Sequence, residues 1–293
     1  MKSCRLCGAA TAVGYEGFVR AGKPGIESPQ PFKVRTCVDC GVGFLDPFES
    51  LDYQTPAYRE SYNTSSTVAA YFEAHDALQA GYLAQVSART SLRGRVIADF
   101  GAGAGAFLDL VSGPARATVA IEPNDIYRAS AAERGHLTYA SVEDLLADPK
   151  APPIDVAVTL HVIEHVADPV LYLTRIRQCL SENGKLFVLT PNADDVLMRL
   201  GHDAYRRFNY RTAHLWYFAR ASLTRCAKAA GFERATTWFE HDYDLSNFAL
   251  WLKDSAPTGN GRSDLFDGPI NGAWKTFLES SGMANAIWMV TEK

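Results

Sequence analysis

Four cysteines near the N-terminus have the spacing of a metal site. Cys4 and Cys7 form one Cys-x-x-Cys-Gly pair, and Cys37 and Cys40 form a second one. Each pair bends two thiolates towards one point, so together they offer the four sulfur ligands of a tetrahedral structural zinc site. Two disulfides or four unrelated thiols are the alternatives. Because four sulfurs leave no open position, we expect this zinc to stabilise a fold and not to catalyse.

A glycine-rich turn follows an apolar run in the middle of the chain. Residues 95–100 predict a buried strand, Gly101, Gly103 and Gly105 form the turn, and a helical pattern begins at Phe107. Such a unit presents main-chain groups at a helix N-terminus, and its glycines let a ligand approach the backbone closely. A turn that binds nothing is the alternative, but closely spaced glycines cost backbone entropy that a ligand site would explain.

The ligand of this turn belongs to one of two classes. The string Gly101-x-Gly103-x-x-Ala106 fits the dinucleotide fingerprint G-x-G-x-x-G/A. Asp99, however, places a carboxylate just before the turn, where it suits a cation better than a pyrophosphate. S-adenosylmethionine (SAM) is such a ligand, because it carries an ammonium and a sulfonium and no phosphate. Glu122, at the end of the next predicted strand, suits the ribose hydroxyls of either ligand.

Histidines and an acid follow the fourth and fifth predicted strands. If SAM is the ligand, methyl transfer to a hydroxyl or a carbon also removes a proton from the acceptor, so a base helps. We expect this base to be His161, directly after the fourth strand, with Glu164 and His165 on the same loop and His214 further on as the other candidates. The alternative is that His161 lines the cofactor, that Glu164 and His165 anchor the next helix, and that alignment of the acceptor suffices.

The elements that must position these residues alternate between strands and helices. Strands are predicted at residues 95–100, 118–122, 136–140, 154–160 and 185–190. Asp168 and Pro169 predict the N-cap and first residue of the helix after the fourth strand. Residues 68–86 predict a long amphipathic helix, and residues 255–272 a loop. The alternation predicts an α/β fold with a parallel sheet covered by helices.

Composition and domain order set the broader expectations. The 293 residues carry a net charge of -4, which gives no electrostatic case for a nucleic acid partner. No apolar run is long enough for a membrane span, and the N-terminus lacks a signal peptide, so a cytoplasmic location is expected. We divide the chain into a zinc-binding module (1–50), a helical connector or lid (51–92) and an α/β domain (93–293).

Three motifs of the α/β domain resemble those of the class I SAM-dependent methyltransferases. The string D-x-G-x-G-x-G at residues 99–105 resembles their motif I. The strings E-H-x-x-D-P at residues 164–169 and G-x-L-x-x-x-x-P-N at residues 184–192 are similar to signatures of the ubiquinone-biosynthesis O-methyltransferase group. The resemblance covers about residues 90–240 and is specific to SAM binding, not to one substrate.

The resemblance implies a Rossmann-like sheet of seven strands, the last antiparallel, with SAM as the cofactor. In such methyltransferases the residue after the third strand often binds the adenine amine as Asp. Here Ser141 takes that position, with Val142 and Glu143 following it. The residues implied to hold SAM are Asp99, Gly101, Ala102, Gly103, Glu122, Pro123, Ser141, Val142 and Glu143.

The cysteine pairs joined to this fold also resemble the C-methyltransferases of nucleotide-activated deoxysugars. We therefore expect a methyltransferase that modifies an oxygen or carbon atom of a small molecule, such as a sugar, glycolipid or natural-product intermediate. Residues 205–211 hold arginines that suit an anionic acceptor, although a solvated basic face is the alternative. Two other functions are an NAD-dependent oxidoreductase or sugar epimerase, disfavoured by Asp99, and a non-catalytic SAM- and zinc-binding module.

Overall fold

The structure is a computed structural model that describes residues 2–49, 67–257 and 266–293. The chain divides into two compact units, which we describe separately. The cysteine unit consists of Met1–Ser50, Leu189–Cys226 and Thr236–Met289. The glycine unit consists of Leu51–Val188, Ala227–Ala235 and Val290–Lys293. Most of the connector before residue 67 lies outside the described residues, and our three-part division of the chain stays a prediction.

A seven-stranded sheet carries the α/β fold, as predicted, and its strand order is β10-β11-β8-β7-β4-β5-β6. The strands are β4 (Val96–Phe100), β5 (Ala117–Ile121), β6 (Leu137–Tyr139), β7 (Ile154–Leu160), β8 (Leu180–Pro191), β10 (Ala235–Glu240) and β11 (Ala286–Glu292). Strand β4 pairs in parallel with β5 on one side and with β7 on the other. The strand order therefore reverses at β4, and ligands of open α/β sheets bind outside the carboxyl ends of the strands at such a point.

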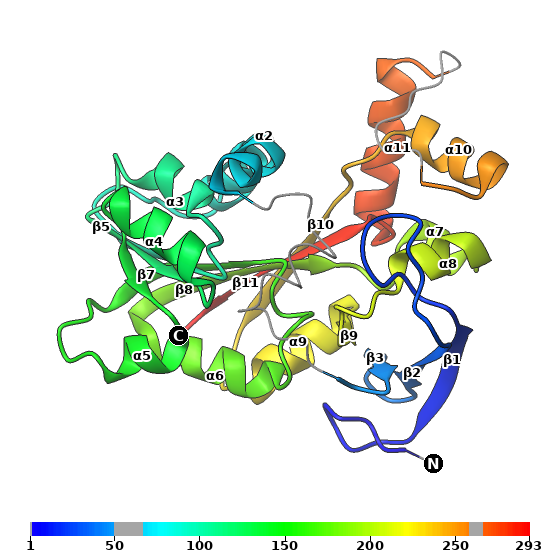
Figure 1. The fold of residues 1–293 in the computed structure, drawn as a ribbon, viewed down its shortest axis with the longest axis horizontal. Coiled ribbons are helices and arrows are strands. Elements are labelled where there is room, and N and C mark those ends of the chain that lie inside the picture. The colour runs from blue at the N-terminus through cyan, green and yellow to red at the C-terminus, as the bar shows by residue number, and fades with distance from the viewer. Residues whose placement is uncertain (1, 50–66, 258–265) are drawn as a thin grey trace. The chain divides into compact units, whose positions relative to one another are not determined.

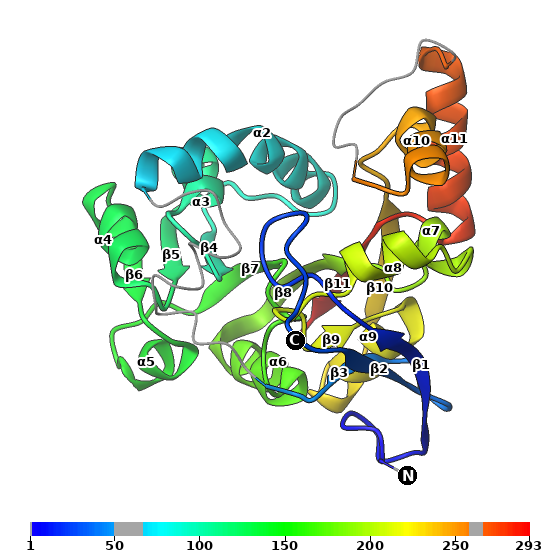
Figure 2. The same cartoon turned by 45° about the vertical axis from the view of Figure 1, so that its right-hand side comes forward.

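The amino-acid pattern of β4 explains its central position. All of its five residues are buried, as expected for a parallel strand that is covered on both faces. Figures 1 and 2 show α2 and α3 on one side of β4, β5 and β7, and α5 and α6 on the other. The one acid in this strand, Asp99, is therefore buried among apolar neighbours.

Four of the five described helices of the glycine unit begin at a polar side-chain cap, and α3 begins directly after Gly105 of the glycine turn. The five helices are α2 (Val68–Ser87), α3 (Ala106–Val111), α4 (Asp125–Glu133), α5 (Val142–Ala147) and α6 (Pro169–Cys179). The Asp168 carboxylate accepts the Leu171 N–H at 2.9 Å, which confirms the predicted start of α6. In α2, Tyr71 and Val86 are buried, so part of the predicted amphipathic helix packs into the unit. Within the part of the chain that the structure describes, no helix combines the length and apolarity of a membrane span.

The cysteine unit holds a second, smaller sheet of four strands in the order β1-β2-β3-β9. Its strands are β1 (Thr11–Gly17), β2 (Phe32–Cys37), β3 (Gly43–Asp46) and β9 (Trp216–Tyr217). Strand β9 pairs antiparallel with β3 although it is far away in sequence. The N-terminal residues thus share their sheet with residues that follow the α/β core.

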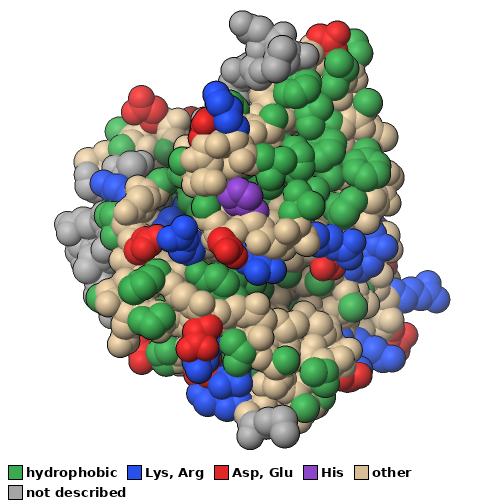
Figure 3. Space-filling view, turned by 90° about the vertical axis from the view of Figure 1, so that its right-hand side faces the viewer, with side chains coloured by type: hydrophobic (Ala, Val, Ile, Leu, Met, Phe, Trp, Pro, Cys, Tyr) green, Lys and Arg blue, Asp and Glu red, His purple; other side chains and the backbone are tan. Residues whose placement is uncertain are grey.

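Five helices of the described residues belong wholly or mostly to this unit, and aromatic rings join two of them, α10 and α11. The five helices are α7 (Val196–Arg199), α8 (Asp203–Asn209), α9 (Arg220–Ala229), α10 (Leu245–Asp254) and α11 (Gly268–Ser281). Trp274 of α11 contacts the rings of Phe248 and Phe277, and hydrophobic side chains gather over α10 and α11 in Figure 3. The loop predicted for residues 255–272 is too long, because Asp267 caps a helix that begins at Gly268.

Candidate cofactor-binding, catalytic and metal sites

The glycine turn between β4 and α3 has a backbone that favours glycine. Gly101, Gly103 and Gly105 have φ angles of 97°, 54° and 92°, in the left-handed region that side chains rarely adopt. Neighbouring side chains also approach the turn closely. A Cβ atom on Gly101 would collide with the Val162 side chain, and one on Gly103 would collide with the Tyr71 hydroxyl of α2. Larger residues are therefore excluded twice, by conformation and by space.

The N–H groups of this turn already have protein acceptors. The N–H groups of Gly101 and Ala102 donate to the Ile121 carbonyl at 2.8 and 3.2 Å, and the Gly103 N–H donates to Glu122 Oε2 at 2.9 Å. A pyrophosphate would need such donors for itself. The turn therefore suits a ligand that donates hydrogen bonds better than one that only accepts them.

Asp99 supplies an acceptor for such a ligand. Its Oδ1 atom is buried and has no hydrogen-bond partner among the described residues. Burial, together with the negative charge of nearby Glu122, raises the pKa of Asp99 to about 8. A buried carboxylate without a partner is unfavourable, and a bound cation would relieve this cost. These properties fit the ammonium group of SAM.

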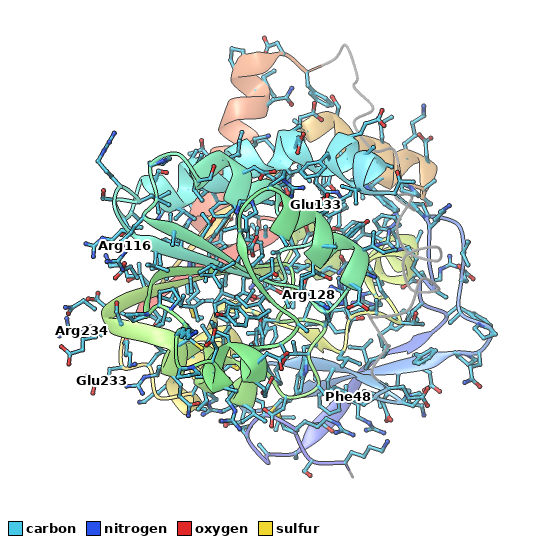
Figure 4. All side chains as sticks on the ribbon, turned by 60° about the vertical axis from the view of Figure 1, so that its left-hand side comes forward. Phe48, Arg116, Arg128, Glu133, Glu233 and Arg234 are labelled. Carbon is cyan, nitrogen blue, oxygen red and sulfur yellow. The ribbon has the colours of Figure 1, made fainter. Side chains whose placement is uncertain are left out.

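Glu122, which directly follows β5, organises the loop around it. Its Oε2 accepts the Gly103 N–H and its Oε1 accepts the Asn124 N–H, both at 2.9 Å. Arg128, labelled on α4 in Figure 4, donates to the Glu122 and Pro123 carbonyls at 2.9 and 3.1 Å. A carboxylate oxygen can accept more than one hydrogen bond, so these contacts are compatible with a ribose ligand. The hydrogen bond by which Glu122 holds the glycine turn in place was not predictable from the sequence.

The residues predicted near the adenine have local roles of their own. The Ser141 hydroxyl caps α5, because it accepts the Asp144 N–H at 3.1 Å and donates to the Asp144 carboxylate at 2.7 Å. Val142 is buried, and Glu143 is exposed with its carboxylate 3.9 Å from Arg175 Nε. The sequence pattern S-x-x-D is a known capping signal and could have revealed the role of Ser141. The adenine contact stays a prediction.

His161 is held in an unusual backbone conformation directly after β7. Its φ angle of 57° is in the left-handed region, although it is not a glycine. Such strain costs about 1–3 kcal/mol and is found preferentially at functional sites. The side chain is 40% exposed, so it is accessible to a ligand. The ring of Tyr82 from α2 lies 6.1 Å from the His161 ring, measured between ring centres.

The structure brings Glu164 and His165 together with His161. Nδ1 of His161 lies 3.5 Å from Glu164 Oε1, and Nε2 of His165 lies 3.9 Å from the same atom. Burial acts to raise the pKa of Glu164, but the hydrogen bond with His161 and the electrostatic effect of His165 outweigh it and lower the pKa. The remaining candidate, His214, belongs to the cysteine unit, where it is buried beside Tyr217.

The four predicted metal ligands form a cluster in the cysteine unit. Their sulfur atoms all lie within 4.8 Å of one another, with Cys4 and Cys40 at 3.8 Å and Cys7 and Cys37 at 3.5 Å. A tetrahedron of thiolates about 2.3 Å from zinc has sulfur–sulfur edges of about 3.8 Å. A disulfide would need about 2.05 Å. The described cysteines are free thiols, so the alternative of two disulfides is wrong and the cluster fits a metal.

A sheet with parallel central strands, a glycine turn at its reversal point and a buried acid before that turn is typical of the nucleotide-binding α/β class. A family profile described as "Methyltransferase domain" matches residues 72–236, so the chain belongs to this methyltransferase family. The expected class, a SAM-dependent methyltransferase, is thereby confirmed and the oxidoreductase alternative is not supported.

Two comparisons show how far the similarity extends. The ubiquinone biosynthesis O-methyltransferase of Caulobacter vibrioides is 37% identical over 113 residues, which are 36% of this chain and 44% of that relative. The match thus spans less than half of the relative's length. The crystal structure of a SAM-dependent methyltransferase from Archaeoglobus fulgidus has a TM-score of 0.52 at 15% identity. It covers 76% of this chain and 96% of the other, and this likeness shows the shared fold alone.

Proposed function

We propose that the chain transfers a methyl group from SAM, bound at the glycine turn, to an oxygen or carbon atom of a small molecule. The acceptor is a sugar, a glycolipid or a natural-product intermediate. The observation that carries the cofactor site is the buried Oδ1 of Asp99, which has no hydrogen-bond partner in the described part of the chain. It shortly precedes a turn in which the N–H groups of Gly101, Ala102 and Gly103 donate to protein oxygens. The similarity to an O-methyltransferase and the resemblance of the cysteine pairs to sugar C-methyltransferases support the acceptor class.

In this proposal different residues around the turn bind different parts of the cofactor. Asp99 binds the ammonium group, Glu122 binds the ribose hydroxyls, and the loop from Ser141 to Glu143 lies along the adenine. Bound SAM supplies a methyl group that is electrophilic because it is attached to a positively charged sulfur. The glycines let the amino-acid part approach the backbone, where carbonyl oxygens are the available partners.

We further propose that His161 removes the acceptor proton. Its Nδ1 faces the Glu164 carboxylate, so the ring keeps a proton there and leaves Nε2 free to accept one. Glu164 is a positioning residue, because its lowered pKa keeps it ionised and its charge holds the ring in one orientation. His165 shares this carboxylate and is the second candidate base.

Replacing His161 with alanine is expected to lower turnover roughly 100-fold or more while SAM affinity hardly changes, because a general base contributes about this factor. The measurement is transfer of labelled methyl from SAM to a panel of sugar nucleotides, glycolipids and phenolic precursors, with SAM affinity measured separately. His165→Ala and His214→Ala are assayed in parallel. If turnover and SAM affinity fall together in His161→Ala, this residue is a cofactor contact. If all three variants keep normal turnover, none of these three histidines is the base.

The four-cysteine cluster has a structural role in the proposal. We propose that Cys4, Cys7, Cys37 and Cys40 bind one zinc ion, whose coordination sphere they fill. Two backbone N–H groups, of Asp39 and Cys40, donate to the Cys37 sulfur at 3.4 Å. Such donors stabilise thiolates, and groups that hydrogen-bond to the ligands are typical of metal sites.

A further inference from the structure

A pocket lies in the cysteine unit, and no cysteine lines it. It has a volume of about 210 Å³, and its walls come from the loop between β1 and β2, from α8 and from the end of α10. The residues that matter for its chemistry are Arg20, Glu27, Arg207, Phe208 and Trp251. None of the expected cofactor, catalytic or metal residues lines it.

Backbone hydrogen bonds fasten two walls of the pocket to each other. The Arg20 N–H donates to the carbonyls of Arg207 and Tyr210 at 3.1 and 2.9 Å, and the Thr212 N–H donates to the Arg20 carbonyl at 3.0 Å. Arg20 is itself buried, and its guanidinium lies 4.3 Å from the centre of the Phe208 ring. The first wall therefore holds a cation in a fixed position, and little ordering remains for a ligand to impose.

The charged side chains of the pocket favour an anion. Arg20 and Arg207 contribute two positive charges and Glu27 one negative charge, so the lining carries a net charge of +1. Arg207 Nη1 lies 3.8 Å from Glu27 Oε1, and both side chains are about half exposed. An exposed ion pair of this kind contributes little stability, so Arg207 can exchange Glu27 for a ligand at low cost. Guanidinium groups suit phosphate and carboxylate because they donate two parallel hydrogen bonds.

The remaining wall is aromatic. The rings of Phe208 and Trp251 lie 5.2 Å apart at an angle of 55°, and the Trp251 ring also packs edge-on against Tyr205. Such rings offer a flat apolar surface with a negative face, on which the C–H groups of a small ring can pack. The volume is below the 300–1,000 Å³ of pockets for drug-sized ligands, so the space suits one ring with one charged group.

We propose that this pocket binds a monosaccharide-sized molecule that carries one phosphate or carboxylate group. The arginines bind the anionic group and the aromatic wall packs against the ring. Two of these residues, Arg207 and Phe208, belong to the basic segment from which the sequence predicts binding of an anion. The proposal does not depend on methyl transfer at the glycine turn, because the pocket is built within the cysteine unit and its occupancy can be measured without SAM.

The test is calorimetric titration of the full chain without SAM, using glucose 1-phosphate, glucuronate, glucose and inorganic phosphate as probes. We expect one of the two sugar anions to bind at least tenfold more tightly than glucose and than inorganic phosphate. Which of them binds more tightly tells whether the site prefers phosphate or carboxylate. Arg207→Gln is expected to weaken this binding about tenfold or more. The matched control is Arg199→Gln, an exposed arginine on α7 that does not line the pocket.

A second variant keeps the proposal falsifiable if Arg207→Gln does not fold. Glu27→Gln retains both arginines and removes the competing carboxylate, so it is expected to tighten binding of the sugar anion several-fold, which a purely structural role of Glu27 would not do. The proposal is overturned if neither sugar anion binds more tightly than glucose, or if binding is the same in Arg207→Gln and Glu27→Gln as in the parent chain.

Discussion

Replacing Asp99 with asparagine is expected to weaken SAM binding about 100-fold, because the ammonium group loses a buried, charged partner. The side chain keeps nearly the same shape, so the fold should be preserved. The measurement is calorimetric titration of SAM into both proteins. Asp254→Asn is the matched control, since Asp254 is an exposed acid at the end of α10 in the cysteine unit. Equal SAM affinity in Asp99→Asn and the parent would show that this carboxylate does not bind the ligand.

The same substitution is expected to change how stability depends on pH. Burial and the charge of Glu122 raise the pKa of Asp99 from 3.8 to about 8, so the folded chain without ligand holds this proton more tightly than the unfolded chain. The contribution of this group to stability is therefore full below about pH 4 and is lost as the pH rises to about 8. Thermal denaturation without SAM should find Asp99→Asn more stable than the parent above pH 8, and a given SAM concentration should stabilise the parent more than the variant.

Replacing Cys37 with serine is expected to cause the largest loss of structure. Binding of a structural zinc ion contributes roughly 10 kcal/mol or more to the folding of small metal modules. Loss of one thiolate should therefore unfold the segment that holds β1 to β3 and lower the metal content from about one zinc per chain to none. Elemental analysis and thermal denaturation measure these effects. SAM binding should persist, because its residues belong to the glycine unit.

Cys179→Ser is the matched control for this experiment. Cys179 lies at the end of α6, outside the cluster, and its thiol donates to the Arg175 carbonyl. Its replacement should leave both the metal content and the unfolding of the N-terminal module unchanged. Purified parent protein that contains no bound metal and has its four N-terminal thiols free to react would rule out the zinc site.

Local patterns in the sequence predicted much of the fold and the position of the candidate site. The buried strand β4, the glycine turn after it and the cap of α6 at Asp168 each depend on a few adjacent residues, so periodicity and residue type were sufficient. The cysteine cluster was predictable for the same reason, because each pair carries its own spacing.

The features that the sequence did not reveal depend on contacts between distant residues. The Glu122 carboxylate accepts the Gly103 N–H, and β9 pairs with β3. No sequence pattern in these segments indicates which distant segment each one contacts. The positive φ angle of His161 depends on the surrounding structure, since residues other than glycine rarely adopt that conformation. The pocket near Arg207 likewise needs three separate segments to form its walls.

The most direct test of the central claim is a calorimetric titration of the purified chain with SAM, with S-adenosylhomocysteine and with NAD. The occupied N–H groups of the turn and the unpartnered Asp99 carboxylate oxygen predict binding of SAM and of its demethylated product, with little binding of NAD. Tighter binding of NAD than of SAM would contradict the account.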